Sequence, residues 1–137
     1  MRYGFSKRTD TGSRKPHKYG AIPTMVDGIR FASKAEARRY SELKLLEKAG
    51  QIARLRIQPR FVLCVPQTNL RGESYDCDGP GLFSVVGYYL ADFCYDELTP
   101  TVTRFVVEDV KGMDTPLSKW KRKHVAAQYG IDVRIVK

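Results

Sequence analysis

The sequence comprises 137 residues, which fit one compact domain and leave little room for a second. Its hydrophobic content of 42% is ordinary for a globular protein, no apolar run reaches the roughly 18 to 20 residues of a membrane span, and the N-terminus lacks the apolar stretch of a secretory signal. Three separated cysteines argue against a disulfide framework or a zinc knuckle, whereas the net charge of +9 favours a polyanionic partner. We therefore expect a cytoplasmic domain with no membrane contact and with nucleic acid as the candidate partner.

The first 18 residues form a distinct basic segment. They carry six lysines or arginines against one aspartate and show no helical or strand periodicity. We expect a flexible arm over residues 1–18, followed by one domain over residues 19–137. Basic side chains of such an arm enter the grooves of nucleic acid or contact successive phosphates, with an affinity that falls as the salt concentration rises. Arg14, Lys15 and Lys18 are therefore candidates for nucleic-acid contact.

A helix follows a short predicted hairpin near the start of the domain. An Asp-Gly pair between apolar runs predicts the hairpin over Thr24–Phe31. Ser33 and Glu36 have the spacing of a capping box, which predicts a helix over residues 34–49 that Gly50 ends. The stripe of this helix expected to face inward comprises Glu36, Tyr40, Leu43 and Leu46.

Strand-forming sequence occupies the middle of the chain. Ile52–Val65 predicts one or two extended pieces broken at the internal proline, and Pro66–Ser84 reads as a turn-rich loop. Val85–Tyr95 is dense in Val and Tyr and predicts one strand. A turn at Asp96–Pro100 then leads to a second strand over Arg104–Lys111.

A second helix and a last strand complete the domain. Pro116 in the first turn and Gly130 as the stop predict a helix over Pro116–Tyr129, with Trp120 expected in the core. Ile131–Val136 predicts a short final strand. This order of elements predicts an α/β fold, a small mixed sheet flanked by helices.

Two acids and a lysine interrupt the apolar strands. Asp92 falls within the run Val85–Tyr95, where a carboxylate must be paired, hydrogen-bonded or bound to a cation. Because side chains alternate along a strand, Asp109 and Lys111 project from one face and Glu108 from the other. If the two strands are neighbours, Asp92 meets Asp109 near their ends. A structural ion pair between Asp109 and Lys111 is the alternative.

This arrangement suits phosphodiester hydrolysis. Oxygen ligands on rigid strands fix Mg²⁺, with Mn²⁺ as a substitute, and we assign Asp92, Asp109 and the Val110 carbonyl as metal ligands. A lysine beside the metal orients or deprotonates the attacking water or neutralises charge on the phosphate, and this is the role assigned to Lys111.

The spacing of these residues resembles the PD-(D/E)xK nuclease superfamily, with Asp92 followed by Asp109-Val110-Lys111-Gly112 on the next strand. The resemblance spans Lys18 to Val136 and implies a restriction-endonuclease-like αβββαβ core and metal-dependent endonuclease activity. It also implies a catalytic and metal-binding role for Glu36, whose capping role is the alternative. Within the superfamily, similarity to a phage and prophage family rests on the segments Lys18-Tyr19-Gly20, Val26–Phe31, Ser33–Tyr40, Gln58-Pro59, Ala91–Phe93 and Val107–Gly112.

Candidates for nucleic-acid contact lie on two further elements. Gln58 is expected in a strand. Its side chain either contacts the site or only forms a hydrogen bond with a backbone group. Lys119, Arg122 and Lys123 share one face of the second helix, which lines DNA beside the site or is simply a solvated face.

Three functions are compatible with these patterns. The leading one is a Mg²⁺-dependent DNA endonuclease, and branched or junction DNA in phage replication or recombination is suggested by analogy alone. Resolving a junction requires two active sites and hence a homodimer, although no clear dimer helix is seen. A catalytically inactive nuclease fold that binds DNA is the first alternative. RNA binding is the second, although Tyr88 and Tyr89 point to opposite faces and form no stacking platform.

Overall fold

The computed structural model of the protein describes residues 21–66 and 83–137, so the predicted arm with Lys18 and most of the predicted loop Pro66–Ser84 lie outside the described residues. The predicted hairpin, both helices and a short final strand are confirmed. In chain order the elements are β1 (Thr24–Val26), β2 (Ile29–Phe31), α1 (Lys34–Lys48), β3 (Ile52–Ile57), β4 (Arg60–Pro66), β5 (Phe83–Leu90), β6 (Phe93–Leu98), β7 (Thr103–Val110), α2 (Pro116–Tyr129) and β8 (Arg134–Val136).

Capping residues explain where the two helices begin and end. The Ser33 hydroxyl accepts a hydrogen bond from the Glu36 N–H at 3.2 Å, which starts α1. In the same way the Thr115 hydroxyl accepts from the Ser118 N–H at 3.2 Å, and α2 ends at Gly130, whose φ of 67° lies in the left-handed region. Neither of these helices is long and apolar enough to cross a bilayer.

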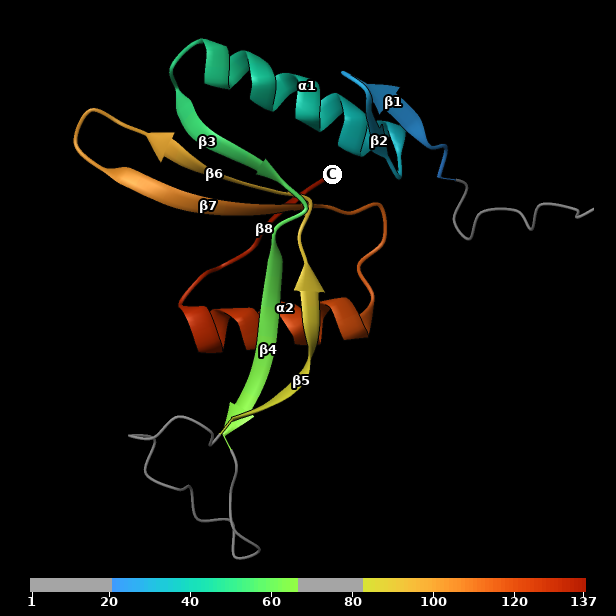
Figure 1. Cartoon of the computed structure of the whole chain (residues 1–137), viewed down its shortest axis with the longest axis vertical. Helices are drawn as coiled ribbons and strands as arrows, with labels where there is room; N and C mark the ends of the chain where they lie inside the picture. The colour runs from blue at the N-terminus through green and yellow to red at the C-terminus, as the bar shows by residue number, and fades with distance from the viewer. Residues whose placement is uncertain (1–20, 67–82) are drawn as a thin grey trace, which may run out of the picture.

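A four-stranded mixed sheet lies between the two helices (Figure 1). Its strand order is β3-β6-β7-β8, with β8 parallel to β7 and the other pairs antiparallel. Strand β6 continues to Leu98, past the start of the turn predicted at Asp96–Pro100. With the β1–β2 and β4–β5 hairpins set aside, the order is α1-β3-β6-β7-α2-β8, which is the expected αβββαβ core. The protein therefore has a mixed α/β fold.

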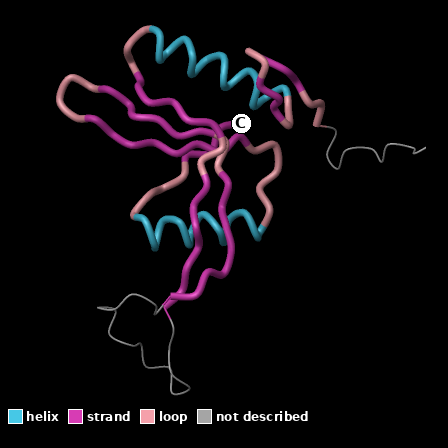
Figure 2. Tube along the Cα trace, in the orientation of Figure 1, coloured by secondary structure: helices cyan, strands magenta, loops and turns pink. Residues whose placement is uncertain are grey.

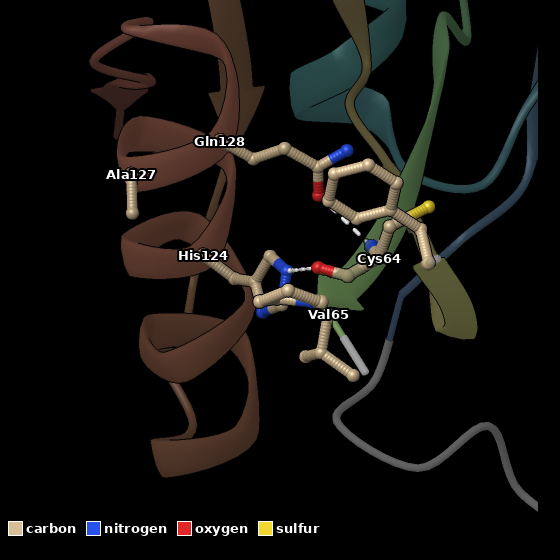
Figure 3. A pocket seen from close by; sticks show the side chains of 7 residues that line it. Cys64, Val65, His124, Ala127 and Gln128 are labelled. Atoms are coloured by element: carbon tan, nitrogen blue, oxygen red, sulfur yellow. Dashed lines mark hydrogen bonds between the residues drawn. The ribbon is translucent and has the colours of Figure 1, made fainter. Parts of the chain in front are cut away.

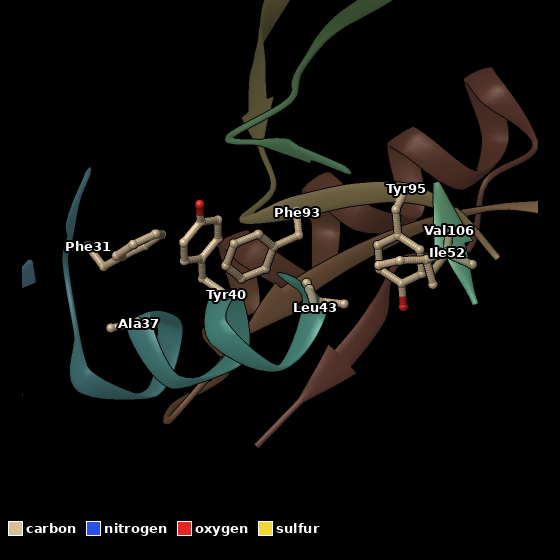
Figure 4. Close-up of a cluster of buried hydrophobic side chains, with 8 residues drawn as sticks. All are labelled: Phe31, Ala37, Tyr40, Leu43, Ile52, Phe93, Tyr95 and Val106. Atoms are coloured by element: carbon tan, nitrogen blue, oxygen red, sulfur yellow. The ribbon is translucent and has the colours of Figure 1, made fainter. Parts of the chain in front are cut away.

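Each face of the sheet has its own hydrophobic core. On the α2 side, Val107 of β7 and Val125 of α2 are fully buried. On the α1 side, the ring of Phe31 lies 5.0 Å from that of Tyr40 and 6.3 Å from that of Phe93, centroid to centroid (Figure 4). Because successive residues of a strand face opposite ways, β6 and β7 contribute to both cores. The α1-side core comprises Phe31, Ala37, Tyr40, Leu43, Ile52, Phe93, Tyr95 and Val106.

Strands β4 and β5 form a separate two-stranded ribbon that extends away from the sheet and packs on α2 (Figure 1, Figure 2). A ring nitrogen of His124 lies 2.8 Å from the Cys64 carbonyl oxygen, and the Gln128 side-chain oxygen accepts from the Cys64 N–H at 2.9 Å (Figure 3). These contacts hold the C-terminal half of α2. Nearer its N-terminus, Trp120 is 52% exposed, so its predicted place in the core is wrong.

The prediction of one strand over Val85–Tyr95 is also wrong, because the chain changes sheets within it. Strand β5 ends in the ribbon, and β6 begins in the four-stranded sheet. The segment between β3 and β4, residues 58–59, crosses from the four-stranded sheet to the ribbon at the same point. There the Gln58 N–H donates to the Asp92 carbonyl at 2.8 Å, and the Ala91 N–H donates to the Pro59 carbonyl at 3.1 Å. This double crossing places Asp92 at the end of the sheet rather than in the middle of a strand.

Gln58 adopts a left-handed conformation at this crossing, with a φ of 52°. A side chain in this region crowds the backbone by roughly 1–2 kcal/mol, and glycine is free of that crowding. We expect Gln58→Gly to raise the free energy of unfolding by about 0.5–1 kcal/mol, once the greater entropy of unfolded glycine is subtracted. Urea denaturation measures this, with Gln58→Ala as the control that keeps the crowding. A destabilised Gln58→Gly would show that the side chain makes a contact the fold requires.

Candidate active site

Asp109 lies on the α2 face of β7 and is only 1% exposed. Its Oδ2 accepts a hydrogen bond from the Tyr89 hydroxyl at 2.5 Å and lies 3.2 Å from Lys111 Nζ. Burial, and after it the adjacent Asp109 carboxylate, raise the pKa of Tyr89 far above its usual value, so the hydroxyl keeps the proton that it donates. Asp109 and Lys111 therefore share one face of β7, as the alternation of side chains predicted.

Asp92 follows the crossing and continues the register of β6 and β7. Phe93 pairs with Glu108, so Asp92 comes opposite Asp109. The Val110 N–H donates to Asp92 Oδ2 at 2.6 Å. Burial, and after it the neighbouring Asp109 carboxyl, raise the pKa of Asp92 to about 7. The two acids are thus crowded together in a place where negative charge is poorly compensated.

Glu108 points to the opposite, α1 face and belongs to a separate network. Its side chain is fully buried, and Arg39 holds both carboxylate oxygens at 2.9 Å. The Tyr95 hydroxyl also donates to Glu108, at 2.6 Å. Burial opposes ionisation of this carboxyl, but the hydrogen bonds from Arg39 and Tyr95 outweigh it and lower the pKa of Glu108. Glu108 is therefore a structural acid, and Asp109 is the acid that adjoins Asp92 and Lys111.

Glu36 takes part in the cap of α1 and also faces the site. Its Oε1 accepts from the Ser33 hydroxyl and its Oε2 from the Ala32 N–H, each at 3.1 Å. Its charge is nevertheless one of the causes that raise the pKa of Asp92. Glu36 and Lys111 also line the same cleft, which has a volume of about 550 Å³. The capping role is thus present in the structure, and the side chain borders the cleft from the α1 side.

The donor atoms of the site suit a hard divalent cation. In the described part of the chain, no group of three or more His, Cys, Asp or Glu side chains is arranged to hold a metal ion. Mg²⁺, however, is commonly bound through one or two carboxylates, with waters and substrate phosphates as its other ligands. Burial, and after it the neighbouring Asp109 carboxyl, raise the pKa of Asp92, and a bound cation would favour its charged form. The residues present therefore fit Mg²⁺ or Mn²⁺. The contact of Val110 with Asp92 is through its N–H, and its carbonyl as a ligand stays a prediction.

The residues predicted to contact nucleic acid have different surroundings. Gln58 is exposed at the chain crossing and not within a strand, which corrects its predicted placement. The guanidinium of Arg122 is mostly buried and donates to both oxygens of Asp114, at 2.7 and 2.9 Å. Lys119 and Lys123 are exposed and line a small groove that also contains Asp114. Arg122 is thus already neutralised by Asp114, whereas Lys119 and Lys123 are exposed to solvent.

Tyr89 and Lys121 were not among the predicted site residues. Tyr89 reaches Asp109 from the ribbon, and the need of a buried tyrosine hydroxyl for a partner was its one signal in the sequence. Lys121 donates to the Tyr88 carbonyl at 2.9 Å and lines a groove together with Lys111. Lys121 lies outside the face of α2 on which the sequence predicted contact, that of Lys119, Arg122 and Lys123.

We expect Tyr89→Phe to weaken Mn²⁺ binding by about 10- to 100-fold, because Asp109 would lose the donor that fixes its Oδ2. Titration calorimetry of the purified protein measures the affinity. Tyr129→Phe is the matched control, since it removes a hydroxyl that bonds the Val62 carbonyl, at 2.7 Å, away from the two acids. Equal Mn²⁺ affinities of the two variants would contradict the positioning role of Tyr89.

Fold and site together define a mixed α/β protein with two adjoining carboxyl groups and a lysine at one end of its sheet. The chain belongs to the family described as "Protein of unknown function (DUF1064)", which matches residues 16–136. Neither a curated protein nor a solved structure matches it. Because the family description assigns no activity, the function has to be inferred from the residues themselves.

Proposed function

We propose that this protein is a metal-dependent endonuclease that hydrolyses the phosphodiester bonds of DNA. The observation that carries the proposal is the pair formed by the half-buried Asp92 and the buried Asp109, with Lys111 Nζ 3.2 Å from Asp109 and a cleft that Lys111 lines. The spacing of these residues resembles that of the PD-(D/E)xK nuclease superfamily, and the αβββαβ order of elements accords with it. A net charge of +9 suits a polyanionic substrate.

Each residue of the site has a distinct task in this proposal. Asp92 and Asp109 would hold Mg²⁺, which would neutralise phosphate charge and acidify a water molecule. Lys111 is partly exposed and borders the cleft, so its ammonium group can meet an incoming phosphate or orient the attacking water. Tyr89 keeps the Asp109 carboxylate in place from the ribbon side. Glu36 lines the same cleft, and besides its two bonds in the cap of α1 its carboxylate would accept a hydrogen bond from a water molecule there.

A cleavage assay with the full chain tests this function. Linear duplex, single-stranded, nicked and four-way-junction DNA are each incubated with Mg²⁺, Mn²⁺ or EDTA. We expect cutting that requires the metal, and the preferred substrate then shows whether branched DNA is the target. A junction-cutting enzyme should also sediment as a homodimer. A folded protein that binds DNA and cuts none of these substrates would contradict the proposal.

One observation favours a second candidate, a nuclease fold that only binds DNA. Both carboxylate oxygens of Glu36 are engaged by the cap of α1, which leaves two carboxylates where many such sites have three. Binding without cleavage in the assay above would select this candidate. The cluster of Asp92, Asp109 and Lys111 speaks against it, because removing carboxyl groups from water is costly and a DNA-binding protein has no need of such a pair.

A further inference from the structure

Lys111 also borders a second groove, on the α2 side of the sheet. This groove has a volume of about 280 Å³ and lies between the end of β5 and the first turns of α2. Tyr88 and Leu90 of β5 form one wall, and Leu117 and Lys121 of α2 form the other. The groove therefore opens directly beside the lysine of the candidate active site.

Exposed aromatic side chains lie in and next to this groove. Tyr88 is 45% exposed, and the guanidinium carbon of Arg60 lies 3.7 Å from the centroid of its ring. Trp120 stands one helical turn after Leu117, and its ring contacts His124 edge-on at 5.4 Å. A soluble domain rarely leaves tryptophan and tyrosine exposed on neighbouring elements, so this surface is a candidate for binding.

The charge of the groove is positive. Lys111 and Lys121 are among its lining residues, which within the described chain include no carboxylate. The groove on the other side of α2 differs, because Asp114 and Asp132 offset Lys119 and Lys123 there. Lys111 is paired with Asp109, and the Lys121 ammonium bonds a backbone carbonyl. A groove that joins exposed aromatic rings with lysines has the composition of a site for single-stranded nucleic acid, in which bases stack on rings and cations hold the backbone.

We propose that this groove binds an unpaired nucleotide of a DNA strand, next to the phosphate held at Lys111. A base inside a duplex stacks on its neighbours, so only an unpaired base offers its face to Tyr88 or Trp120. Lys121, anchored by its bond to the Tyr88 carbonyl, lies where the adjoining phosphate would pass. The position of the nucleotide relative to the cut rests on the proposed function. The substrate class is then DNA with single-stranded segments, such as flaps, gaps and open junctions.

Trp120 is the single tryptophan of the chain, so its fluorescence reports on this surface alone. The full-length protein is titrated in EDTA, where no cleavage occurs, with oligothymidylate and with a duplex of equal length. We expect the single strand to quench Trp120 emission and to bind more tightly than the duplex. We also expect Tyr88→Leu to weaken single-strand binding by on the order of 10- to 100-fold, the usual effect of losing one stacked base.

Matched variants distinguish the loss of stacking and of charge in the groove from the loss of an aromatic ring or a positive charge elsewhere on the protein. Phe105→Leu removes another exposed aromatic ring of a strand, and it lies six residues before Lys111 in β7, roughly 20 Å away along the strand. Lys48→Gln removes the same charge as Lys121→Gln from an exposed position in the last turn of α1. We expect Phe105→Leu and Lys48→Gln to keep the single-strand preference, and Tyr88→Leu and Lys121→Gln to reduce it. Melting temperatures near that of the wild type confirm that each variant is folded.

Two results would overturn this inference. One is duplex binding at least as tight as single-strand binding, together with no effect of Tyr88→Leu. The other is a change of Trp120 emission with protein concentration alone, which would make this surface a contact between two copies of the chain. Neither result depends on metal, so cleavage in Mg²⁺ would still uphold the proposed function. Conversely, single-strand binding through Tyr88 without cleavage would uphold the groove and refute the nuclease.

Discussion

Asp109→Asn is expected to slow DNA cleavage by at least about 10³-fold, because it removes one of the two carboxylates proposed to hold the metal, an interaction worth several kcal/mol in the transition state. Asparagine keeps the shape of the side chain and can still accept from Tyr89. Lys111→Met is expected to slow cleavage by about 10²- to 10⁴-fold, since the neighbouring ammonium group would be missing. Single-turnover cleavage of the preferred substrate at saturating protein measures both effects.

The controls for these two variants are DNA affinity and a nearby acid. Affinity measured in EDTA should stay within a few-fold of the wild type for both, because we expect the contacts to the DNA backbone to be spread over many cations. Asp114→Asn removes an acid that pairs with Arg122 close to the site and should leave metal-dependent cleavage within about tenfold. If Asp109→Asn cuts DNA at the wild-type rate, Asp109 is not a metal ligand of the reaction.

Arg39→Met is expected to lower the free energy of unfolding by about 3–5 kcal/mol, a large fraction of the roughly 5–15 kcal/mol that a domain of this kind has. Its guanidinium makes two hydrogen bonds of 2.9 Å to Glu108, whose side chain has no exposure to solvent. Without Arg39 the Glu108 carboxylate is left with the Tyr95 hydroxyl and the more distant Arg134, 3.4 Å away. Urea denaturation followed by circular dichroism measures the loss.

A double variant and a neighbouring arginine make this prediction specific. Arg39→Met combined with Glu108→Gln should recover much of the lost stability, because the buried charge is removed together with its partner. Arg38→Met should change stability by no more than about 0.5 kcal/mol, since its contact with Glu42 is exposed to solvent. A cost below about 1 kcal/mol for Arg39→Met would show that Glu108 is solvated or protonated when Arg39 is absent.

Local chemistry was enough to predict the helices and the orientation of the acids. Ser33 and Gly130 mark helix ends through hydrogen bonding and backbone conformation that involve only nearby residues. The alternation of side chains along a strand likewise predicted that Asp109 and Glu108 lie on opposite faces, because it depends only on the geometry of one strand. These features required no knowledge of which elements pack together.

Features that depend on distant partners were not predictable. Val85–Tyr95 looks like one strand because most of its residues are β-branched, aromatic or aliphatic, and the crossing at Asp92 is fixed by hydrogen bonds with a segment more than 30 residues earlier. Trp120 looked like a core residue because it shares a face of α2 with Leu117 and Ala127, but the ribbon packs on the part of the helix near His124. The neutralisation of Glu108 by Arg39 across 69 positions was equally hidden.

The central claim is that Asp92 and Asp109 together bind a divalent metal, and Mn²⁺ titration by calorimetry and electron paramagnetic resonance tests it most directly. We predict one specific Mn²⁺ site in the wild type, competed by Mg²⁺, that Asp92→Asn and Asp109→Asn each abolish and Asp114→Asn retains. Binding of Mn²⁺ that all three variants share, or no binding by the folded wild type with or without DNA, would contradict the claim.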